Sequence, residues 1–349
     1  MCFSQLEQLW EGNKSFQKLK FIELSHSQHL IKTPDFSGAP KLRRIILEGC
    51  TSLVKVHPSI GALKKLIFLN LEGCKNLKSF SSSIHLESLQ TITLSGCSKL
   101  KKFPETEEAS RDTGKYGEFE KLFLDDTGLR ELPSSIEHLN GLVLLKLKNC
   151  KKLASLPESI CKLTSLQTLT LSGCSELKKL PDDMGSLQCL VKLKANGTGI
   201  QEVPTSITLL TKLEVLSLAG CKGGNLSQGI WLYVCAHHQQ KDCDRLFACS
   251  ILLEKLNLSG CNLLEGALPS DLSSLSWLEC LDLSRNSFIT VPNLSRLPRL
   301  KGSYWNTARV FDLCQSFHQI LKNYWPMIAH PWKPFQIHQV HMHGGTPDI

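Results

Sequence analysis

The chain lacks any apolar run long enough to cross a membrane. Among its 349 residues, 42% of which are hydrophobic, the longest candidate runs only from Ile230 to Ala236. A membrane-spanning helix needs about 20 apolar residues. The opening residues, MCFSQLEQLWEGNKS, also lack the basic stretch and apolar core of a secretion signal. The sequence therefore predicts no membrane association and a location in the cytoplasm, with the nucleus as an alternative.

The motifs of common enzymes are missing as well. G-x-S-x-G, H-E-x-x-H and G-x-G-x-x-G do not occur. Lys14 and Ser15 end like a phosphate-binding loop, but the opening glycine of G-x-x-x-x-G-K-S is absent and Asn13 replaces the second glycine. Adjacent carboxylates such as Asp182 and Asp183 are typical of a solvated surface. We therefore expect neither catalytic activity nor a bound cofactor.

Fifteen cysteines are present, yet none forms a C-x2-C pair. The densest Cys/His group lies between residues 235 and 249, and its spacings match none of the common zinc fingers. Five histidines between 318 and 343 indicate a polar tail rather than a metal-binding tract. The sequence therefore predicts no metal site.

What the sequence does contain is one phrase repeated eleven times. One copy, LVLLKLKNCKKLASLPESICKL, begins at Leu142. Within it, Leu145 and Leu147 are two apart, as are residues on one face of a strand. Ile160 and Leu163 are three apart, as in a short helix or 3-10 turn. A strand, a corner and a return segment make one coil of a solenoid, which buries its core by stacking on neighbouring coils. The phrase begins at Leu19, Leu42, Leu66, Leu89, Phe119, Leu142, Leu166, Leu190, Leu213, Leu253 and Leu278.

The repeats therefore predict a right-handed α/β solenoid, or horseshoe, with a parallel sheet of about eleven strands on its concave face. Leu145, Leu147, Leu169 and Leu171 are expected to point into the core. The first residues match only the later part of a repeat, which indicates a chain truncated inside a larger solenoid. The expected segments are a partial repeat at 1–18, repeats at 19–221 with a loop inserted at 105–118, an insertion at 222–252, repeats at 253–300, and a non-repeat cap or tail at 301–349 with a helix around 307–323.

One column of the repeat, eight residues after its start, favours cysteine. The remaining units have Ser, Thr or Asn there, so every occupant is small and able to form hydrogen bonds. The column is expected to tie backbone groups between coils where the chain leaves the strand. A coil spacing of about 5 Å leaves disulfides open on distance. Side chains stacked in one direction suit bridges poorly, so reduced thiols are expected. The cysteines are Cys50, Cys74, Cys97, Cys150, Cys174, Cys221 and Cys261.

The repeat reads L-x-x-L-x-L-x-G-C-x-x-L-x-x-L-P-x-x-I-x-x-L and resembles a leucine-rich repeat (LRR). The opening stretch LEQLWEGNKSFQKLKFIELSHSQHLIKTPDFS is similar to the start of the LRR region of plant intracellular immune receptors with TIR, NB-ARC and LRR domains. The resemblance implies a module that senses pathogen effectors and restrains a nucleotide-binding switch in defence signalling. Its implied partners are an effector or the TIR and NB-ARC domains of the same receptor. The TIR and NB-ARC sequences are themselves absent, so none of their functional residues maps onto this chain.

Two other readings remain. Residues 264–269, LEGALP, are similar to the L-x-G-x-I-P phrase of plant cell-surface LRR receptors, which suggests a receptor ectodomain. A cytosolic scaffold of the Ras-group LRR type would share the Leu-Pro-x-x-Ile corner, although it usually has Asn where this chain has Cys.

The concave face is the expected partner-binding surface, because residues two, four and six after each repeat start point away from the core. These columns pass from acidic toward basic along the chain. The net charge of +8 is compatible with nucleic acid, but the charges are scattered and not interleaved with stacking aromatics, so a protein partner is expected. The candidate site residues are Glu48, Glu72, Phe123, Asp125, Lys146, Lys148, Lys192 and Lys194.

Overall fold

The computed structural model describes residues 2–12, 14–80, 83–84, 88–106, 119–221, 252–269, 272–290 and 293–304. All of them belong to the first of two compact units, which ends at Thr307. The Cys/His group between 235 and 249 and the helix expected at 307–323 lie outside the described residues. So does the tail with its histidines.

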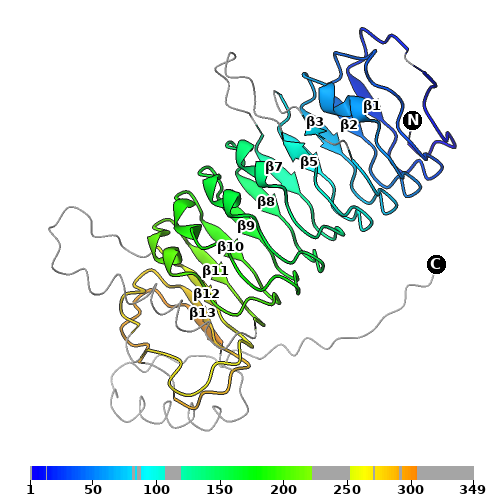
Figure 1. The fold of residues 1–349 in the computed structure, drawn as a ribbon. Helices are drawn as coiled ribbons and strands as arrows, with labels where there is room; N and C mark the ends of the chain where they lie inside the picture. Colours follow the sequence, from blue (N-terminus) through cyan, green and yellow to red (C-terminus); the bar gives the residue numbers. More distant parts are fainter. Residues whose placement is uncertain are drawn as a thin grey trace, which may run out of the picture. The chain divides into compact units, whose positions relative to one another are not determined.

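Twelve of the described strands form one long parallel sheet, with the coils stacked in chain order (Figure 1). Each of the twelve has three residues, and the central residue is buried in every one except the last, where Ser303 is exposed. The strands are β1 (Phe21–Glu23), β2 (Arg44–Ile46), β3 (Phe68–Asn70), β5 (Thr91–Thr93), β7 (Lys121–Phe123), β8 (Leu144–Lys146), β9 (Thr168–Thr170), β10 (Lys192–Lys194), β11 (Val215–Ser217), β12 (Lys255–Asn257), β13 (Cys280–Asp282) and β14 (Gly302–Tyr304).

The twelfth strand, β14, exceeds the expected count of eleven. Gly302 and Tyr304 pair with Cys280 and Asp282 of β13, although they follow the last leucine-rich phrase. The backbone N–H of Lys301 donates to the carbonyl of Glu279 at 2.9 Å, so main-chain bonds alone extend the sheet. Strand pairing of this kind leaves no apolar pattern in the sequence, which is why the repeat count missed it.

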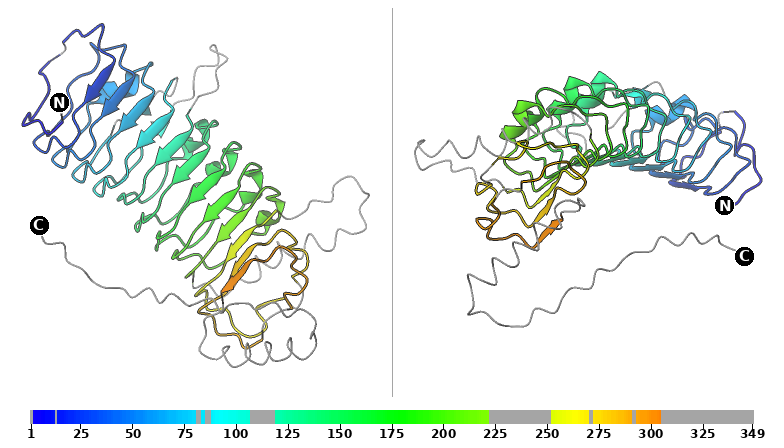
Figure 2. Two further views of the ribbon diagram at one scale, coloured as in Figure 1. Left: turned by 180° about the vertical axis from the view of Figure 1, so that it is seen from behind. Right: turned by 90° about the horizontal axis from the view of Figure 1, so that it is seen from below.

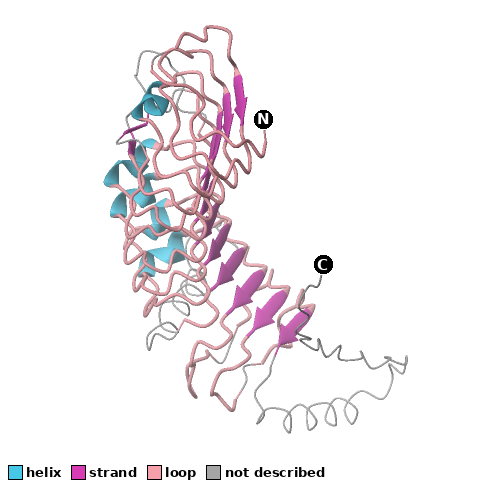
Figure 3. Ribbon diagram, turned by 90° about the vertical axis from the view of Figure 1, so that its right-hand side faces the viewer, coloured by secondary structure: helices cyan, strands magenta, loops and turns pink. Residues whose placement is uncertain are grey.

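The return segments carry single turns of 3-10 helix on the side of the coils opposite the sheet (Figure 3). Each of these turns is only three to five residues long. A segment of that length is too short for a stable α-helix. Pro133, Pro157 and Pro204 hold the chain extended just before three of these turns. The turns are η1 (Pro58–Ala62), η3 (Ser134–His138), η4 (Glu158–Lys162), η5 (Met184–Ser186) and η6 (Thr205–Leu209).

The hydrophobic core is one continuous cluster of buried residues, most of them leucine, between the sheet and these turns. Leu145, Leu147, Leu169 and Leu171 have no exposed surface, which confirms the inward positions expected from the repeat. The sheet lines the inner side of the curved stack of coils (Figure 2). The side chains on the other side of each strand are therefore available to a partner on the concave face.

The Gly-Cys pair of the motif has a conformational cause. The residue before the ladder position takes a left-handed backbone in coil after coil, with φ of +67° at Gly49 and +76° at Gly96. A Cβ atom added to Gly96 would lie 3.3 Å from the Cα of Gly73 in the preceding coil. Glycine is therefore favoured by both conformation and space. Asn149, at φ +59°, is one of the residue types that tolerate this region.

The cysteine column forms the inter-coil ladder expected from the sequence. The thiol of Cys50 donates to the carbonyl of Leu24 at 3.2 Å, and that of Cys74 donates to Leu47 at 3.2 Å. In coils without cysteine, the Asn286 amide donates to the carbonyl of Leu258 in the preceding coil, whereas the Thr127 hydroxyl donates to Leu124 in its own coil. The cysteines add a second hydrogen bond to corner carbonyls that already accept a backbone N–H, such as that of Leu24 from Ser27 and that of Leu47 from Cys50.

Alkylation of the reduced full chain near pH 8 tests this ladder. Cys2 is exposed and Cys189 and Cys280 are partly exposed, so these thiols are expected to react first. Burial raises the pKa of Cys97 to about 12, so its inert thiol form persists in the native chain. Peptide mapping by mass spectrometry measures both groups. After denaturation without reductant the ladder thiols should all react, and bridged peptides between neighbouring ladder positions would contradict the assignment.

The segment expected as a loop at 105–118 begins instead with regular structure. Strand β6 (Glu105–Thr106) pairs in parallel with β4 (Ser83–Ile84), and Thr106 is buried. The amide of Thr106 donates to the Ser135 hydroxyl at 3.0 Å, which fixes the pair to the next coil. The loop expectation is therefore wrong for residues 105 and 106, while 107–118 lie outside the described residues.

Residues 2–12 and 14–18 stack on the first complete coil through main-chain bonds. The amide of Phe3 donates to Ser25 at 2.9 Å, and the amide of Phe16 donates to Gly38 at 2.7 Å. Leu9 and Phe16 pack against the core, whereas Phe3 is 73% exposed. This first turn of the solenoid consequently contributes apolar side chains to both the core and the surface.

Candidate protein-binding surface

The concave face carries a group of lysines near its middle. In β10, Lys192 and Lys194 are exposed on either side of the buried Leu193. Lys194 lies opposite Thr170 of β9, and Lys146 of β8 lies opposite Thr170 on its other side. The two lysines are thus separated by two strand spacings, or about 10 Å. The half-buried Thr168 and Thr170 form a small, neutral floor between them.

An aromatic ring orients one of these lysines. The Nζ atom of Lys146 lies 5.3 Å from the centre of the Phe123 ring, and the two residues are direct neighbours in β8 and β7. A contact of this kind contributes about 0.5–1 kcal/mol at an exposed site. Phe123 is therefore part of the same surface as the lysines, as its column predicted.

Asp125 serves mainly as a tie between coils. Its Oδ1 accepts a hydrogen bond from the backbone N–H of Lys148 at 2.7 Å. Burial raises the pKa of the Asp125 carboxyl, while that N–H bond and the positive charge of Lys146 act in the opposite direction. A partly buried, hydrogen-bonded carboxylate is less available to a partner than its place in the column suggested.

The lysine group, defined as Lys146, Lys148, Lys192 and Lys194, has no carboxylate within 4 Å of its ammonium groups in the described part of the chain. The Asp125 carboxylate interacts with Lys146 and Lys148 and offsets only part of their charge, so the middle of the concave face keeps a positive potential. Such a surface can attract and orient an acidic partner.

The first coils present a mixed surface rather than an acidic one. Glu48 accepts a hydrogen bond from the Asn70 amide at 3.2 Å, and Glu72 is exposed. Arg44, which the sequence prediction missed, lies between Phe21 and Phe68 in the strand register. Its Cζ atom is 5.0 Å from the centre of the Phe68 ring. Arg44 and Phe68 each lie two residues after a repeat start, so the column of outward-pointing positions that gave the candidate site residues also contains them.

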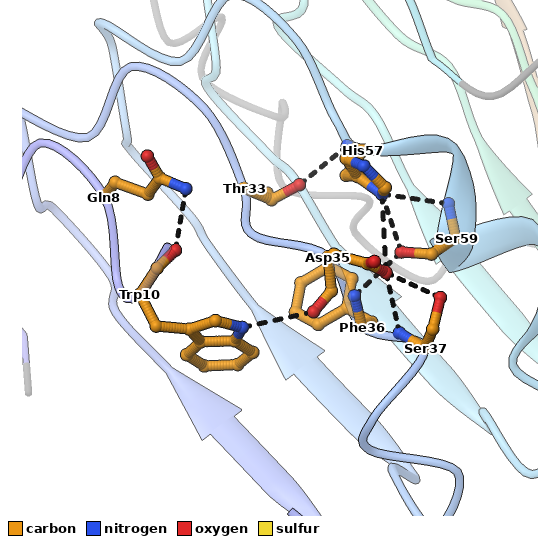
Figure 4. Close-up of polar contacts among 8 residues, drawn as sticks. All are labelled: Gln8, Trp10, Thr33, Asp35, Phe36, Ser37, His57 and Ser59. Atoms are coloured by element: carbon orange, nitrogen blue, oxygen red, sulfur yellow. Dashed lines mark hydrogen bonds and ion pairs between the residues drawn. The ribbon is translucent and has the colours of Figure 1, made fainter. Parts of the chain in front are cut away.

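A Ser-His-Asp group occurs in the first coils, near Trp10 and Phe36 (Figure 4). The Ser59 hydroxyl is 2.9 Å from Nδ1 of His57, and Oδ1 of Asp35 is 3.8 Å from the same nitrogen. A catalytic triad needs serine and aspartate on different ring nitrogens, so this arrangement cannot relay a proton. His57 instead accepts the Ser59 amide and caps η1, while Ser59 accepts the Phe36 amide at 2.8 Å.

No described helix is both long and apolar enough to span a membrane. Within the same residues, no group of three or more His, Cys, Asp or Glu side chains is arranged to hold a metal ion.

Comparison with protein families identifies the repeats. Residues 85–180 match the family described as "Disease resistance protein RPS4B-like, leucine-rich repeats", and residues 252–275 match the general leucine-rich repeat. An LRR protein of Leptospira interrogans is similar in structure, with a TM-score of 0.52 at 22% identity over 84% of this chain and 82% of that one. The protein is thus a leucine-rich-repeat solenoid.

Two plant proteins define the kind of LRR more closely. The TMV resistance protein N of Nicotiana glutinosa is 39% identical over 300 residues, which cover 83% of this chain and 24% of that protein. The disease resistance-like protein DSC1 of Arabidopsis thaliana is 37% identical over 333 residues, covering 94% of this chain and 25% of that protein. Over most of this chain, the repeats are similar to the leucine-rich-repeat region of plant TIR-NB-LRR disease-resistance proteins. The chain spans about a quarter of the length of these two relatives.

Proposed function

We propose that this chain is the protein-recognition module of an intracellular plant immune receptor, which senses pathogen effectors and regulates a nucleotide-binding switch. The observation that carries the proposal is the lysine group on the concave face, whose four ammonium groups form no ion pair within 4 Å among the described residues. Lys146 and Lys148 lie within residues 85–180, which match the disease-resistance repeats, and Lys192 and Lys194 lie in the strand next to β9. An array of parallel strands with outward side chains offers a rigid surface for binding but no machinery for catalysis.

The partner best suited to this surface is a protein with an acidic face. It can be an effector, or the TIR and nucleotide-binding domains of the same receptor. The four lysines outnumber the Asp125 carboxylate beside them and repel one another, and an acidic partner relieves that repulsion. The proposed location is the cytoplasm, with the nucleus as an alternative.

Charge reversal of the lysine group tests the proposal. The variant Lys146→Glu, Lys148→Glu, Lys192→Glu and Lys194→Glu should bind the separately expressed nucleotide-binding domain of a TIR-NB-LRR relative at least about tenfold more weakly, a loss of about 1.4 kcal/mol or more. Titration calorimetry at low salt measures the affinity. Circular dichroism confirms that the variant is folded, because all four side chains point away from the core.

The matched control reverses Lys18, Lys20, Lys41 and Lys65, which are exposed and lie outside the strands. The net charge changes equally, so this variant should retain binding within about twofold if the concave face is the docking site. An equal loss in both variants would show a general charge effect and reject the concave site. Absence of binding by the unaltered chain would reject the nucleotide-binding domain as the partner.

A further inference from the structure

A second basic surface lies beyond the carboxyl ends of the strands. It consists of exposed cations on either side of the buried leucine that follows each ladder position, such as Leu77 and Leu153. We call this surface the basic flank. Its members are Lys32, Lys55, Lys75, Lys78, Lys99, Lys101, Lys102, Arg130, Lys151, Lys152, Lys178 and Lys179.

Main-chain bonds hold the basic flank in register from coil to coil. Lys32 and Lys55 form a parallel bridge, and Lys55 bridges to Ser79. Further along, the amide of Arg130 donates to the carbonyl of Lys101 at 3.4 Å, and the amide of Ala154 donates to Arg130 at 3.1 Å. Bridges of this type place successive coils about 5 Å apart. Cations scattered along the sequence thus become a continuous row in the structure.

The charge of this row is strongly one-sided. In the seven coils that begin between Leu19 and Leu166, these positions hold twelve cations and only two carboxylates, those of Glu131 and Glu176. The excess of ten is larger than the net charge of +8 of the entire chain. By contrast, the column one residue after the repeat start mixes both signs, with Lys20 and Arg43 followed by Glu120, Glu214, Glu254 and Glu279.

The flank cations also lack ionic partners in the described part of the chain. Lys99 bonds the neutral amide of Asn76 at 2.7 Å. Elsewhere, Lys162 pairs with Glu137 at 2.7 Å and Lys301 pairs with Glu279 at 2.8 Å. Neighbouring like charges in register are unfavourable. A surface that faces only solvent has no need to gather positive charges apart from negative ones.

We propose that the basic flank binds an extended acidic segment of a partner polypeptide that runs across the coils. The four coil steps from Lys78 to Lys178 cover about 19 Å at the usual strand spacing. About six residues of an extended chain, at about 3.4 Å each, span the same length. The flank columns contain no aromatic side chain on which bases could stack, which favours a polypeptide over single-stranded nucleic acid.

An acetylated, fluorescein-labelled octaglutamate is a suitable probe for the full chain. Fluorescence anisotropy at low salt should show binding that weakens as ionic strength rises, because exposed charges are screened. The flank variant Lys78→Glu, Lys101→Glu, Lys152→Glu and Lys178→Glu should bind at least about tenfold more weakly. A tetraglutamate probe should also bind more weakly, since it reaches fewer coils.

A control variant with Lys18, Lys20, Lys41 and Lys65 changed to Glu carries the same charge difference at exposed positions outside both the basic flank and the lysine group. It should stay within about threefold of the unaltered chain. Equal losses in both variants, or no binding at all, would overturn the flank assignment. Tighter binding of a DNA duplex of equal charge would replace the acidic polypeptide by a nucleic acid and also overturn it. The concave docking site is tested with a different probe, so either proposal can fail alone.

Discussion

Raising the pH from about 8.5 to 10 is expected to lower the free energy of unfolding of the reduced chain by several kcal/mol. Burial raises the pKa of Cys97, Cys161 and Cys261 to about 12 in the folded chain, and raises that of Cys74 still further. In the unfolded chain these thiols ionise near pH 8.5. Above that pH the folded state holds more protons than the unfolded state, so stability falls as pH rises. Below it the stabilisation is fully present.

Each fully buried thiol contributes a slope of about 1.4 kcal/mol per pH unit, so four of them over 1.5 units give an upper value of about 8 kcal/mol. Urea titrations at several pH values with reductant present measure the effect. The variant Cys97→Ser keeps a hydroxyl donor at the ladder position but removes one titrating group. For this variant, the slope of the free energy of unfolding against pH should be smaller by about a quarter of the slope that the four thiols contribute together. A stability that stays flat between pH 8.5 and 10 would contradict the burial of these thiols.

Truncation of Leu145 to Ala is expected to lower the free energy of unfolding by about 2–5 kcal/mol. Leu145 has no exposed surface, and its strand pairs with β7 on one side and β9 on the other. The cavity therefore affects the interfaces of one coil with both neighbours, on which a solenoid depends. Chemical denaturation measures the change.

The matched control for this truncation is Lys148→Ala, three residues further along the same coil. Lys148 is exposed, and its inter-coil hydrogen bonds come from its backbone, which donates to Asp125 and accepts from the N–H of Asp126. Its truncation should change stability by no more than about 0.5 kcal/mol. A loss below about 1 kcal/mol for Leu145→Ala would indicate a core that collapses around the missing side chain.

The period of the sequence was sufficient to predict the class of fold and the inward leucines. Apolar residues such as Leu145 and Leu147 recur at fixed positions, and a period of about 24 residues allows few alternatives. Strand β14 escaped prediction because main-chain pairing of Gly302–Tyr304 requires no apolar side chain. Glu105 and Thr106 read as a polar loop because their partner strand lies in another coil.

The candidate surface was predictable in outline only. Alternation along each strand correctly placed Lys192 and Lys194 outside the core. The environment of Asp125 depends on Lys148, which is 23 residues away, and no local pattern reports that contact. The basic flank was overlooked for the same reason. Lys32 and Lys55 become neighbours only after coils stack, so charges that look scattered in the sequence form a row.

The inter-coil ladder is insensitive to how much chain separates its members. Cys221 reaches the carbonyl of Ala195, 26 residues earlier, at 3.1 Å, and Cys261 reaches that of Leu218, 43 residues earlier, at the same distance. The corner contact thus accommodates inserted sequence without a change in geometry. The return segments are therefore natural grafting sites, where a foreign peptide or tag can be inserted while the inner face keeps its register.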